Sequence, residues 1–551
     1  MGDYYTIYLF SFIVACFIIY DRYNKWTNNK KSVKKLIDTW GIGDYEKYHE
    51  GDFENIATFF NHKMSDKFYI DDITWNDLEF DEIYKKLNHT MSSVGEEYLY
   101  YLLRTPIFNQ DTLKKRNIKM EEFELDAQNR IALQKTLQKL DKKRSMSISD
   151  IVYGTMKDYR GTPILLIRIL SIISILWLIS ILIYPEIGLI FLFTIFPLNM
   201  LIHYSSRKQI ENNISSIKYV VNLIVTSKKC IPYITDKDVQ SQLIDLYNNA
   251  KILSSIRFKF LYPSNASEDL FGAIFDYLRI ITLFDLFMYS KMIRLISDKK
   301  IYIKEIFEVL GELDALISLA SYRSGLEEYT TPIIHTKEDD FLRFEKAYHP
   351  LLTKPEKNTL NKSQSILITG ANASGKSTFL KTIGINQIFA QTFYTVLATS
   401  YESKLVKVCT AMSVKDNILQ NESYYIAEIK AVKRILDEVK KEDGKVLCIV
   451  DELLKGTNTK ERIVGAYQIL DYLSNYSYVY AATHDIELTD LLKEKMDNYH
   501  FQSEITNNDI YFDYRIKDGK SLDTNAIELL RIFDFNEEII SRSKAMLKAM
   551  I

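Results

Sequence analysis

Long apolar runs alternate with helix-patterned polar stretches in the first two thirds of the chain. Residues 4–20 form an uncharged run of about 17 positions, and two further runs at 163–184 and 187–204 are separated only by Pro185-Glu186. Runs of this length can cross the hydrocarbon core of a bilayer. The pattern therefore predicts an N-terminal transmembrane helix and a transmembrane hairpin. A pair of buried core helices is the alternative interpretation of the hairpin.

Basic residues flank these runs and set their expected orientation. Lys and Arg residues cluster at 22–35, after the first run, and others lie at 157–160 and 207–208, at the outer ends of the hairpin. Positively charged flanks stay on the cytoplasmic side of a membrane. The sequence thus predicts a multi-pass protein of the cell membrane, with the C-terminal part of the chain in the cytoplasm.

The stretches between and after the apolar runs have the periodicity of amphipathic helices. Residues 83–143 mix charged and apolar positions with a helical period, and 212–226 and 301–320 form longer runs of the same kind. We therefore expect an all-α core and lever region before the C-terminal part of the chain.

A different pattern begins with the short apolar run 366–368, which predicts a buried strand. The sequence Gly-Ala-Asn-Ala-Ser-Gly-Lys-Ser follows at 370–377, and residues 379–389 are apolar with a helical period. The pattern G-x-x-x-x-G-K-S between a strand and a helix is typical of a phosphate-binding loop. Lys376 would reach the β- and γ-phosphates, and the Ser377 hydroxyl would bind Mg²⁺. A chance match in a Gly/Ser-rich loop is the alternative, but the flanking strand and helix argue against it.

A second apolar run, residues 445–450, ends in Asp451-Glu452. At the carboxyl end of a parallel strand, Asp451 would hold Mg²⁺ through water and Glu452 would act as general base on the attacking water. The alternative is an exposed, solvated acidic pair. Together with the phosphate loop, this pair predicts an enzyme that binds ATP and Mg²⁺ and hydrolyses the γ-phosphate.

Composition adds only a few constraints on partners, metal sites and domain number. The net charge is −2, so any surface for nucleic acid must be local, such as the basic stretch 139–144. The four cysteines contain no C-x-x-C pair, which argues against a zinc site or a disulfide framework. At 551 residues the chain is too long for a single hydrophobic core.

The C-terminal segment resembles the ATPase domain of the MutS family of DNA mismatch-repair proteins, a branch of the ABC-type ATPases. In the segment that resembles the family's signature motif, Tyr424 stands where the family has a threonine. Including thinner matches upstream, the likeness covers roughly residues 85–150 and 300–551. It is carried by the loop Thr369-Gly370-Ala371-Asn372, a signature-like run that ends Ser423-Tyr-Tyr-Ile-Ala-Glu428, the metal strand and D-loop from Asp451 to Thr459, and the pair Thr483-His484.

The resemblance implies a role for each matched residue. His484 would sense the γ-phosphate, Gln391 would belong to the glutamine loop, and His500 would approach the adenine. Ser423 would reach across a homodimer, formed through the ATPase domains, to the nucleotide of the partner subunit. The residues expected to bind ATP through the phosphate loop are Gly370, Asn372, Ser374, Gly375, Lys376, Ser377 and Thr378.

The resemblance also implies what the chain lacks. About sixty cytoplasmic residues precede the core-like segment, which is too few for the mismatch-binding domain of the family. The predicted hairpin occupies the place of the DNA-gripping clamp. Double-stranded DNA remains a candidate partner, and no protein partner can be named.

The expected fold class is an α/β P-loop domain of ABC type at the C-terminus, preceded by an all-α core and lever region with three transmembrane helices. The expected function is a membrane-anchored ATPase in which ATP hydrolysis drives conformational switching, with DNA binding related to mismatch repair. The alternative is an ATP-driven mechanoenzyme that acts on a membrane or protein partner without DNA. The expected segments are a transmembrane helix at 1–21, a cytoplasmic helical region at 22–160, the hairpin at 161–204, a lever region at 205–345 and the ATPase domain at 346–551.

Overall fold

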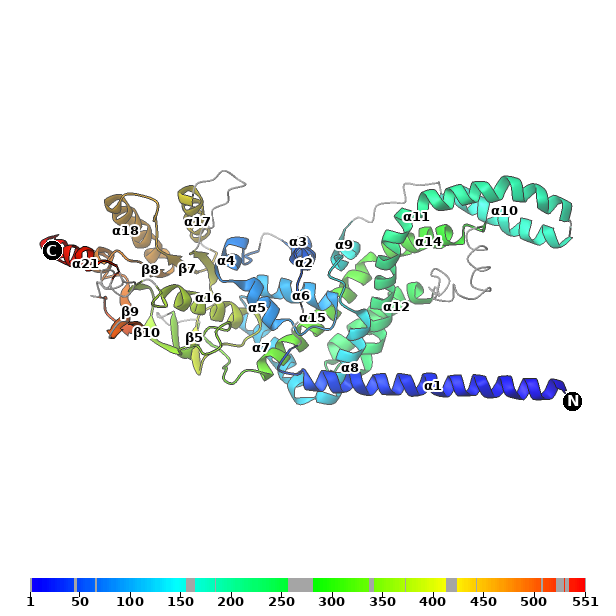
Figure 1. The fold of residues 1–551 in the computed structure, drawn as a ribbon, viewed down its shortest axis with the longest axis horizontal. Helices are drawn as coiled ribbons and strands as arrows, with labels where there is room; N and C mark the ends of the chain where they lie inside the picture. The colour runs from blue at the N-terminus through cyan, green and yellow to red at the C-terminus, as the bar shows by residue number, and fades with distance from the viewer. Residues whose placement is uncertain are drawn as a thin grey trace. The chain divides into compact units, whose positions relative to one another are not determined.

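The computed structural model describes most of the 551 residues (Figure 1). Contacts group the chain into two units, with unit 1 formed by Met1–Met64, His89–Tyr101 and Phe123–Ser318, and unit 2 by Ser65–Asn88, Leu102–Glu122 and Leu319–Ile551. The linear segment boundaries expected from the sequence stay predictions. The description leaves out residues 1, 44–46, 65–66, 155–163, 184, 256–280, 336–340, 372, 413–423, 442, 507–508, 522–529, 531–534 and 551.

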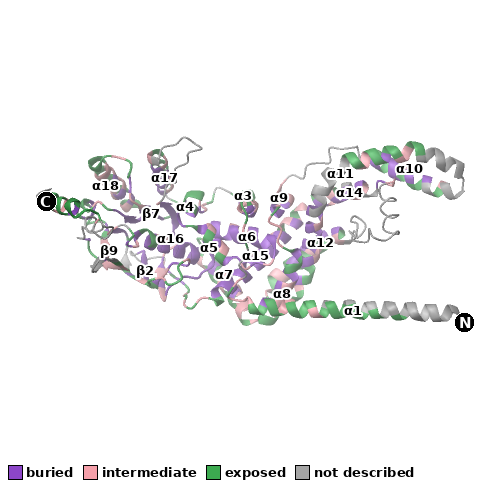
Figure 2. Cartoon of the chain, in the orientation of Figure 1, coloured by how far each residue is buried: buried purple, intermediate pink, exposed green. Residues whose placement is uncertain are grey.

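Unit 1 is helical in its described residues, as the amphipathic pattern predicts. Its core brings together apolar side chains of several helices, among them Leu223, Leu246, Leu286 and Leu310. The buried face of α15 is visible in Figure 2. The helices are α1 (Gly2–Asp38), α2 (Asp52–Ile56), α3 (Thr58–Lys63), α8 (Ala127–Leu137), η1 (Gln138–Leu140), α9 (Ile148–Tyr153), α10 (Ile164–Ile183), α11 (Pro185–Cys230), η2 (Ile231–Tyr233), α12 (Lys237–Ser255) and α14 (Phe284–Asp298), with parts of α6 (Ser93–Arg104), α7 (Gln110–Leu125) and α15 (Lys300–Ser324).

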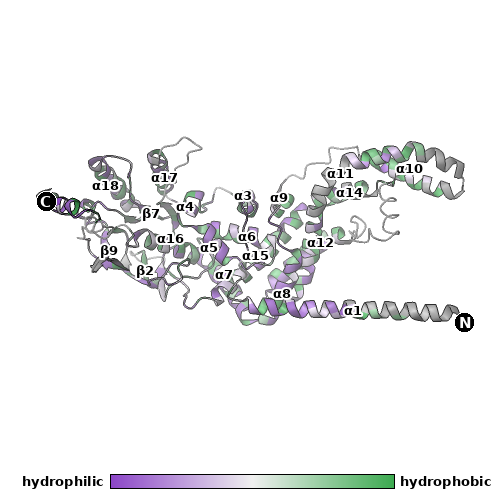
Figure 3. Cartoon of the chain, in the orientation of Figure 1, coloured by the Kyte–Doolittle hydropathy of each residue, from purple (hydrophilic) through white to green (hydrophobic). Residues whose placement is uncertain are grey.

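The prediction of three transmembrane helices is wrong. In the described part of the chain, no helix combines the length and the apolar character needed to cross a bilayer. The first apolar run belongs to α1, which continues to Asp38 through a strongly hydrophilic stretch (Figure 3). The runs of the expected hairpin lie in α10 and α11, and Ile167 and Leu170 of α10 belong to the core of unit 1. The predicted location in the cell membrane is wrong for the same reason.

Buried polar contacts join α10 and α11 to each other and to Ile281. Asn199 of α11 is buried, and its Nδ2 donates to Oγ of Ser174 on α10 at 2.7 Å and to the carbonyl oxygen of Ile281 at 2.6 Å. Ser174 is buried as well. Other helices cover only part of the α10 run, since Ile167 and Leu170 are buried while Leu165, Ile172 and Leu176 are exposed. Hydropathy alone therefore does not tell which apolar run crosses a bilayer.

Unit 2 contains the mixed α/β fold expected at the C-terminus. In its described residues, one sheet has the strand order β10-β9-β4-β8-β7-β6 and a second has the order β1-β5-β2-β3. In the first sheet β10 pairs antiparallel with β9, and the other neighbours pair parallel. The strands are β1 (Ile333–Ile334), β2 (Leu342–Ala347), β3 (Asn358–Ser363), β4 (Ile366–Thr369), β5 (Ser400–Ser403), β6 (Lys407–Ala411), β7 (Val446–Asp451), β8 (Tyr478–Ala482), β9 (Asp497–Thr506) and β10 (Asp509–Asp518).

The central strands of the first sheet are buried along their length. Every residue of β4 and β8 is buried, as is every residue of β7 before Asp451. Strands covered on both faces read as continuous apolar runs. Because the strands are parallel, the loops that follow β4, β7 and β8 meet at one edge of the sheet. The helices of unit 2 include α4 (Asp72–Asp77), α5 (Phe80–Leu87), α16 (Lys376–Thr392), α17 (Tyr424–Val439), α18 (Thr459–Tyr476), α19 (Glu487–Leu491) and α21 (Glu537–Met550).

Candidate functional site

The loop between β4 and α16 has a backbone that glycine adopts most easily. The φ angle is 141° at Gly370 and 107° at Gly375, values that L side chains rarely take. A Cβ atom at Gly370 would also lie 2.5 Å from the carbonyl oxygen of Phe501 in β9. The two glycines therefore allow a tight loop close to the neighbouring strand. Asn372 lies outside the described residues.

Lys376, the first residue of α16, folds back over this loop. Its Nζ donates to the carbonyl oxygens of Gly370 and Ala371 at 2.9 Å each, and burial lowers the pKa of Lys376 to about 8. No side chain caps the start of α16, which leaves its first N–H groups available. The Oγ of Ser374 is buried without a hydrogen-bond partner among the described residues. An ammonium group beside an uncapped helix N-terminus favours an anion.

Ser377 and Asp451 meet at the carboxyl ends of β4 and β7. The Oγ of Ser377 donates to Oδ2 of Asp451, and Oδ1 of Asp451 is buried without a partner in the described part of the chain. Mg²⁺ is commonly held by one or two protein oxygens, with phosphates and water completing its coordination. The described residues include no cluster of three or more His, Cys, Asp or Glu that could hold a metal. The Ser377–Asp451 pair therefore fits Mg²⁺ bound together with a phosphate.

Glu452 follows directly and is engaged on both carboxylate oxygens. Its Oε1 lies 2.8 Å from Nε2 of His484, and its Oε2 contacts Nζ of Lys455. Burial, together with the charges of Lys376 and Lys455, lowers the pKa of His484, so this imidazole is neutral near pH 7. A carboxylate and a neutral imidazole thus lie at the same sheet edge as the Ser377–Asp451 pair.

A cavity of about 350 Å³ opens beside the phosphate loop. Gly375 and Thr378 line it on the loop side, and His349, Leu352 and Tyr514 are among its other walls. His349 is 5% exposed, its burial lowers its pKa to about 4, and its Nε2 has no hydrogen-bond partner among the described residues. The volume falls within the range of small-molecule pockets. The cavity can therefore hold a ligand group that continues from a phosphate in the loop.

Comparison with known proteins agrees with this geometry. Residues 366–551 match the family model described as MutS domain V. Over this segment the chain is similar to proteins of the MutS family.

Three MutS relatives illustrate how far the similarity extends. Human MutS protein homolog 4 is 33% identical over 236 residues, which cover 40% of this chain and 24% of that protein. The DNA mismatch repair protein MutS of Natronomonas pharaonis is 26% identical over 260 residues, covering 45% of this chain and 30% of that protein. The protein of the same name from Borreliella burgdorferi is 27% identical over 262 residues, again covering 45% and 30%. The matched segment thus spans about a quarter to a third of the length of these relatives.

Not every residue singled out by the MutS resemblance lies at the loop. Gln391 is fifteen residues after Lys376 in α16, which at about 1.5 Å per residue separates the two by about 22 Å. Gln391 is fully buried there, and its Oε1 accepts a hydrogen bond from the backbone N–H of Val406 at 2.9 Å. The structure therefore does not bring Gln391 to the phosphate loop.

His500 lies closer to the loop but outside the cavity wall. It pairs with Thr369 across the sheet, and its Nδ1 is 3.1 Å from the carbonyl oxygen of Gly519. It is not among the residues that line the cavity. Ser423 lies outside the described residues, so the structure does not place it.

Sequence reasoning missed the walls of the cavity. His349 and Leu352 follow β2, and the likeness of Tyr348-His349-Pro350 to the loop that leads into the MutS ATPase domain was the available signal. Tyr514 lies in β10, where the pairing with β9 is irregular between Phe512 and Ile516. A break in register changes which side chains face the cavity, and the sequence does not show it.

Proposed function

We propose that this chain is a Mg²⁺-dependent ATPase of the MutS type, in which domain V binds ATP and hydrolyses its γ-phosphate to switch conformation. The observation that carries this proposal is the contact of Ser377 with Asp451 beside the Lys376 ammonium. These groups come from a loop, a helix and a distant strand, yet they converge at one sheet edge together with Glu452. A chance match to the loop motif would not bring a carboxylate pair to the same place.

The phosphate groups of ATP are assigned to the loop. Lys376 neutralises the β- and γ-phosphates, while Ser374, Thr378 and the backbone N–H groups from Gly370 to Gly375 orient them, with Asn372 as a further contact. Ser377 and Asp451 would hold Mg²⁺, which when bound neutralises charge that develops on the phosphoryl oxygens.

Proton transfer is assigned to Glu452 and His484. Glu452 takes a proton from the attacking water, and His484 orients the Glu452 carboxylate and lies toward the γ-phosphate. The base and sugar are assigned to the cavity. There neutral His349 can form a hydrogen bond with the ligand, and the Tyr514 ring can pack against an aromatic base. His500 stays a candidate contact at the edge of the base, and Gln391 has no role in this mechanism because of its distance from the loop.

A homodimer through the ATPase domains and a duplex DNA partner complete the first candidate function. In the dimer, Ser423 would contact the nucleotide bound by the other subunit. Relatives of this chain carry the name DNA mismatch repair protein MutS, which supports double-stranded DNA as the partner.

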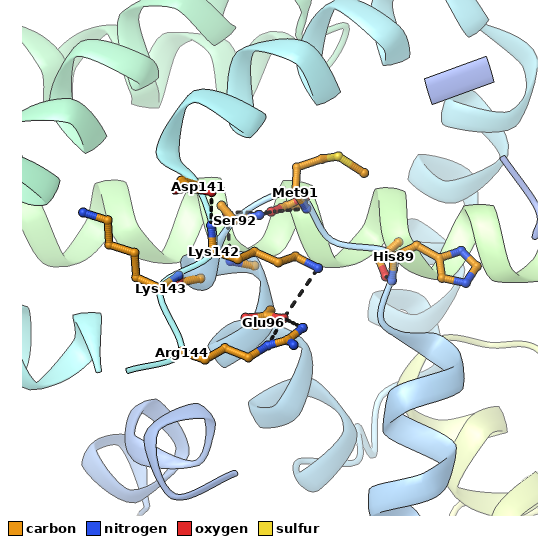
Figure 4. Close-up of polar contacts among 12 residues, drawn as sticks. His89, Met91, Ser92, Glu96, Asp141, Lys142, Lys143 and Arg144 are labelled. Atoms are coloured by element: carbon orange, nitrogen blue, oxygen red, sulfur yellow. Dashed lines mark hydrogen bonds and ion pairs between the residues drawn. The ribbon is translucent and has the colours of Figure 1, made fainter. Parts of the chain in front are cut away.

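One observation in unit 1 favours a second candidate function. Figure 4 shows Lys142 and Arg144 of the basic stretch 139–144 directed at Glu96, and Arg144 Nη2 and Lys142 Nζ lie 2.5 and 3.5 Å from its Oε1. Glu96 is 1% exposed, so these two cations neutralise a buried carboxylate instead of standing free for phosphates. The second candidate is therefore an ATP-driven mechanoenzyme that acts on a protein partner without DNA.

Titration of duplex DNA at several salt concentrations separates the two candidates. Lys and Arg contacts to phosphates release counterions, and six or more such contacts lower the affinity by about 10³-fold or more between about 50 and 200 mM salt. A steep salt slope supports the DNA-binding function. Absence of salt-dependent binding supports a protein partner.

Phosphate release from ATP tests the ATPase itself. The purified full chain is assayed with Mg²⁺ and then with a chelator, alongside Asp451→Asn and the control Asp437→Asn. Asp437 is an exposed acid that pairs with Lys433 one turn away on α17, far from the loop in sequence. We expect Mg²⁺-dependent release in the parent and in Asp437→Asn, and at least a tenfold loss in Asp451→Asn. A parent that releases no phosphate with Mg²⁺ contradicts the proposed function.

A further inference from the structure

The turn after β7 has a backbone conformation that its residues do not favour. The φ angles of Glu452 and Leu454 are 55° and 60°, in the left-handed region. Non-glycine residues keep such values where their surroundings hold them. Hydrogen bonds hold this turn: Glu452 N donates to the carbonyl oxygen of Ala482 at 2.9 Å, and Leu454 N donates to Oε1 of Glu428. The position of Glu452 therefore depends on the side chain of Glu428, which belongs to helix α17.

Glu428 points from α17 into the protein. It is 6% exposed, burial raises its pKa, and its Oε2 has no hydrogen-bond partner among the described residues. Hydrogen bonds from the backbone N–H groups of Leu454 and Lys455 oppose this rise, but burying a carboxyl group with one oxygen unsatisfied is unfavourable for stability by itself. One turn earlier, Tyr425 packs on the same region, since a Cβ atom on Gly456 would lie 3.2 Å from Tyr425 Cβ. The start of α17 therefore lies directly against the turn that carries Glu452.

The far part of α17 is anchored by the short helix α4. Arg434 donates to Oδ2 of Asp71 and to the carbonyl oxygen of Thr410 in β6. Asp77, at the other end of α4, accepts hydrogen bonds from Thr410 Oγ1 at 2.6 Å and from Met412 N at 3.0 Å. These contacts fix α17 to the edge of the sheet through residues that precede the ATPase domain by more than 250 positions.

We propose that Glu428 is a positioning residue for ATP hydrolysis: it holds Leu454 in the left-handed conformation and thereby keeps Glu452 facing the Ser377–Asp451 pair. The contact of Arg434 with Asp71 supports the same function by fixing α17. This inference rests on the proposed function, which assigns Glu452 as the base. Without the Glu428 carboxylate, Leu454 N loses its acceptor and the turn relaxes toward ordinary backbone angles, which moves the Glu452 carboxylate.

Substitutions at Glu428 test this proposal through the separation of turnover from binding. In Glu428→Ala we expect kcat to fall at least tenfold, with the Kd of an N-methylanthraniloyl derivative of ATP changed less than threefold. Glu428→Gln should retain kcat within about threefold, because its amide oxygen can still accept from Leu454 N. Glu428→Asp keeps the charge but is one methylene shorter, so it should resemble the alanine variant. Lys433→Ala, on the exposed face of α17, is the matched control and should behave as the parent.

A rescue experiment distinguishes positioning from a general loss of structure. Glycine adopts positive φ without strain, so Leu454→Gly in the Glu428→Ala background should restore kcat per folded protein at least threefold, although it removes an apolar side chain from the core. Parental kcat in Glu428→Ala or in Glu428→Asp, or equal losses in kcat and nucleotide affinity, would overturn the proposal. If Glu428→Ala does not fold, the comparison of Glu428→Asp with Glu428→Gln tests the proposal: kcat should fall in the first and be retained in the second. A parent without phosphate release instead refutes the proposed function before any variant is compared.

Discussion

The Nε2 atom of His484 lies 2.8 Å from Oε1 of Glu452, while Lys455 contacts the other oxygen of the same carboxylate. The imidazole is exposed by its surface area, and its lowered pKa keeps it mostly neutral near pH 7. A neutral imidazole can orient the carboxylate by donating one hydrogen bond, whereas a charged one would hold it as an ion pair. The proton on His484 should therefore control the basicity of Glu452.

This relationship predicts the pH dependence of turnover. The pKa of His484 is lowered by burial and by the charges of Lys376 and Lys455, so less than half of this imidazole is protonated at pH 6.5 and the protonated fraction grows as the pH falls. We expect kcat to fall toward acidic pH with a midpoint below pH 6.5, because protonated His484 opposes proton transfer to Glu452. Steady-state phosphate release as a function of pH measures it, and His484→Asn should lower kcat and remove the acidic limb. An acidic limb centred at or above pH 6.5 contradicts a neutral His484.

Substitutions of Lys376 and Glu452 should have different effects. Lys376→Ala removes the cation that neutralises the phosphates, so nucleotide affinity should fall by about 100-fold, worth about 2.7 kcal/mol. Glu452→Ala leaves the loop intact, so binding should stay within threefold while kcat falls by about 10²-fold or more. Binding of a fluorescent ATP derivative and phosphate release separate the two. Parental turnover in Glu452→Ala would show that the base has been assigned to the wrong residue.

The phosphate loop and the Asp451-Glu452 strand could be predicted because each is encoded by neighbouring residues. Strand, glycine loop and helix follow one another over residues 366–389, and the parallel sheet then brings β4 and β7 to the same edge. The contact between Ser377 and Asp451 is a direct consequence of that topology. The roles assigned to these residues stay predictions until the variants are measured.

The parts that the sequence did not reveal depend on contacts between distant residues. The apolar runs of α10 and α11 look alike whether lipid or other helices cover them, so the transmembrane prediction failed. Gln391 matched a family position by its letters, but the continuous helix α16 carries it away from the loop. The hydrogen bond from Leu454 N to Glu428 joins the turn after β7 to helix α17, and no local sequence pattern predicts it.

Glu97 predicts how the stability of unit 1 depends on pH. Its carboxylate accepts hydrogen bonds from the backbone N–H groups of Ile148 at 2.7 Å and Ser149 at 3.2 Å, yet burial raises its pKa to about 8. A raised carboxyl pKa contributes stability that is present below the unfolded pKa and is lost as the pH rises through about 8. The free energy of unfolding should fall by up to about 1.4 kcal/mol per pH unit over this range.

Chemical denaturation at pH 5, 6.5 and 8.5 measures this loss. In Glu97→Gln the denaturation midpoint should depend less on pH, because the titrating group is gone. Glu96→Gln is an unsuitable control, since Glu96 pairs with Lys142 and Arg144. The exposed residue Glu54 is a better one, and Glu54→Gln should keep the parental dependence. An unchanged pH dependence in Glu97→Gln would assign it to another group.

Gly95 is expected to tolerate no side chain. A Cβ atom there would lie 2.2 Å from Oδ2 of Asp314, a buried carboxylate that accepts from Met91 N at 2.9 Å and from Ser92 Oγ at 2.6 Å. In an ordinary helix Gly→Ala is stabilising, but this collision should make Gly95→Ala destabilising by about 1–3 kcal/mol. Because the collision needs both partners, Gly95→Ala combined with Asp314→Ala should cost less than the sum of the two single changes. Denaturation midpoints measure this, and a stabilised Gly95→Ala refutes the close contact.

The last prediction concerns the dimer. Lys376 and Ser377 contact one side of a bound triphosphate, and burying the remaining γ-phosphate charge without donors would be costly. In the proposed dimer, Ser423 of the other subunit supplies a hydroxyl donor. Lys376→Ala and Ser423→Arg proteins should each be inactive alone, because each homodimer lacks one half of both sites. In a mixed heterodimer one site carries both changes and the other carries neither, so mixing should restore phosphate release to at most about half of the parental rate per dimer.

Mixing the two inactive variants in equal amounts gives the measurement, and a mixture of Lys376→Ala with Glu452→Ala serves as the control. Lys376 and Glu452 are assigned to the same subunit's half of the site, so each site of that heterodimer lacks one of them and activity should not return. The parental rate per protein should also rise with concentration through the dimerisation range. A rate per protein that is independent of concentration well below that range would mean that each subunit hydrolyses ATP alone, and Tyr424 would then be the first departure from the family pattern to examine.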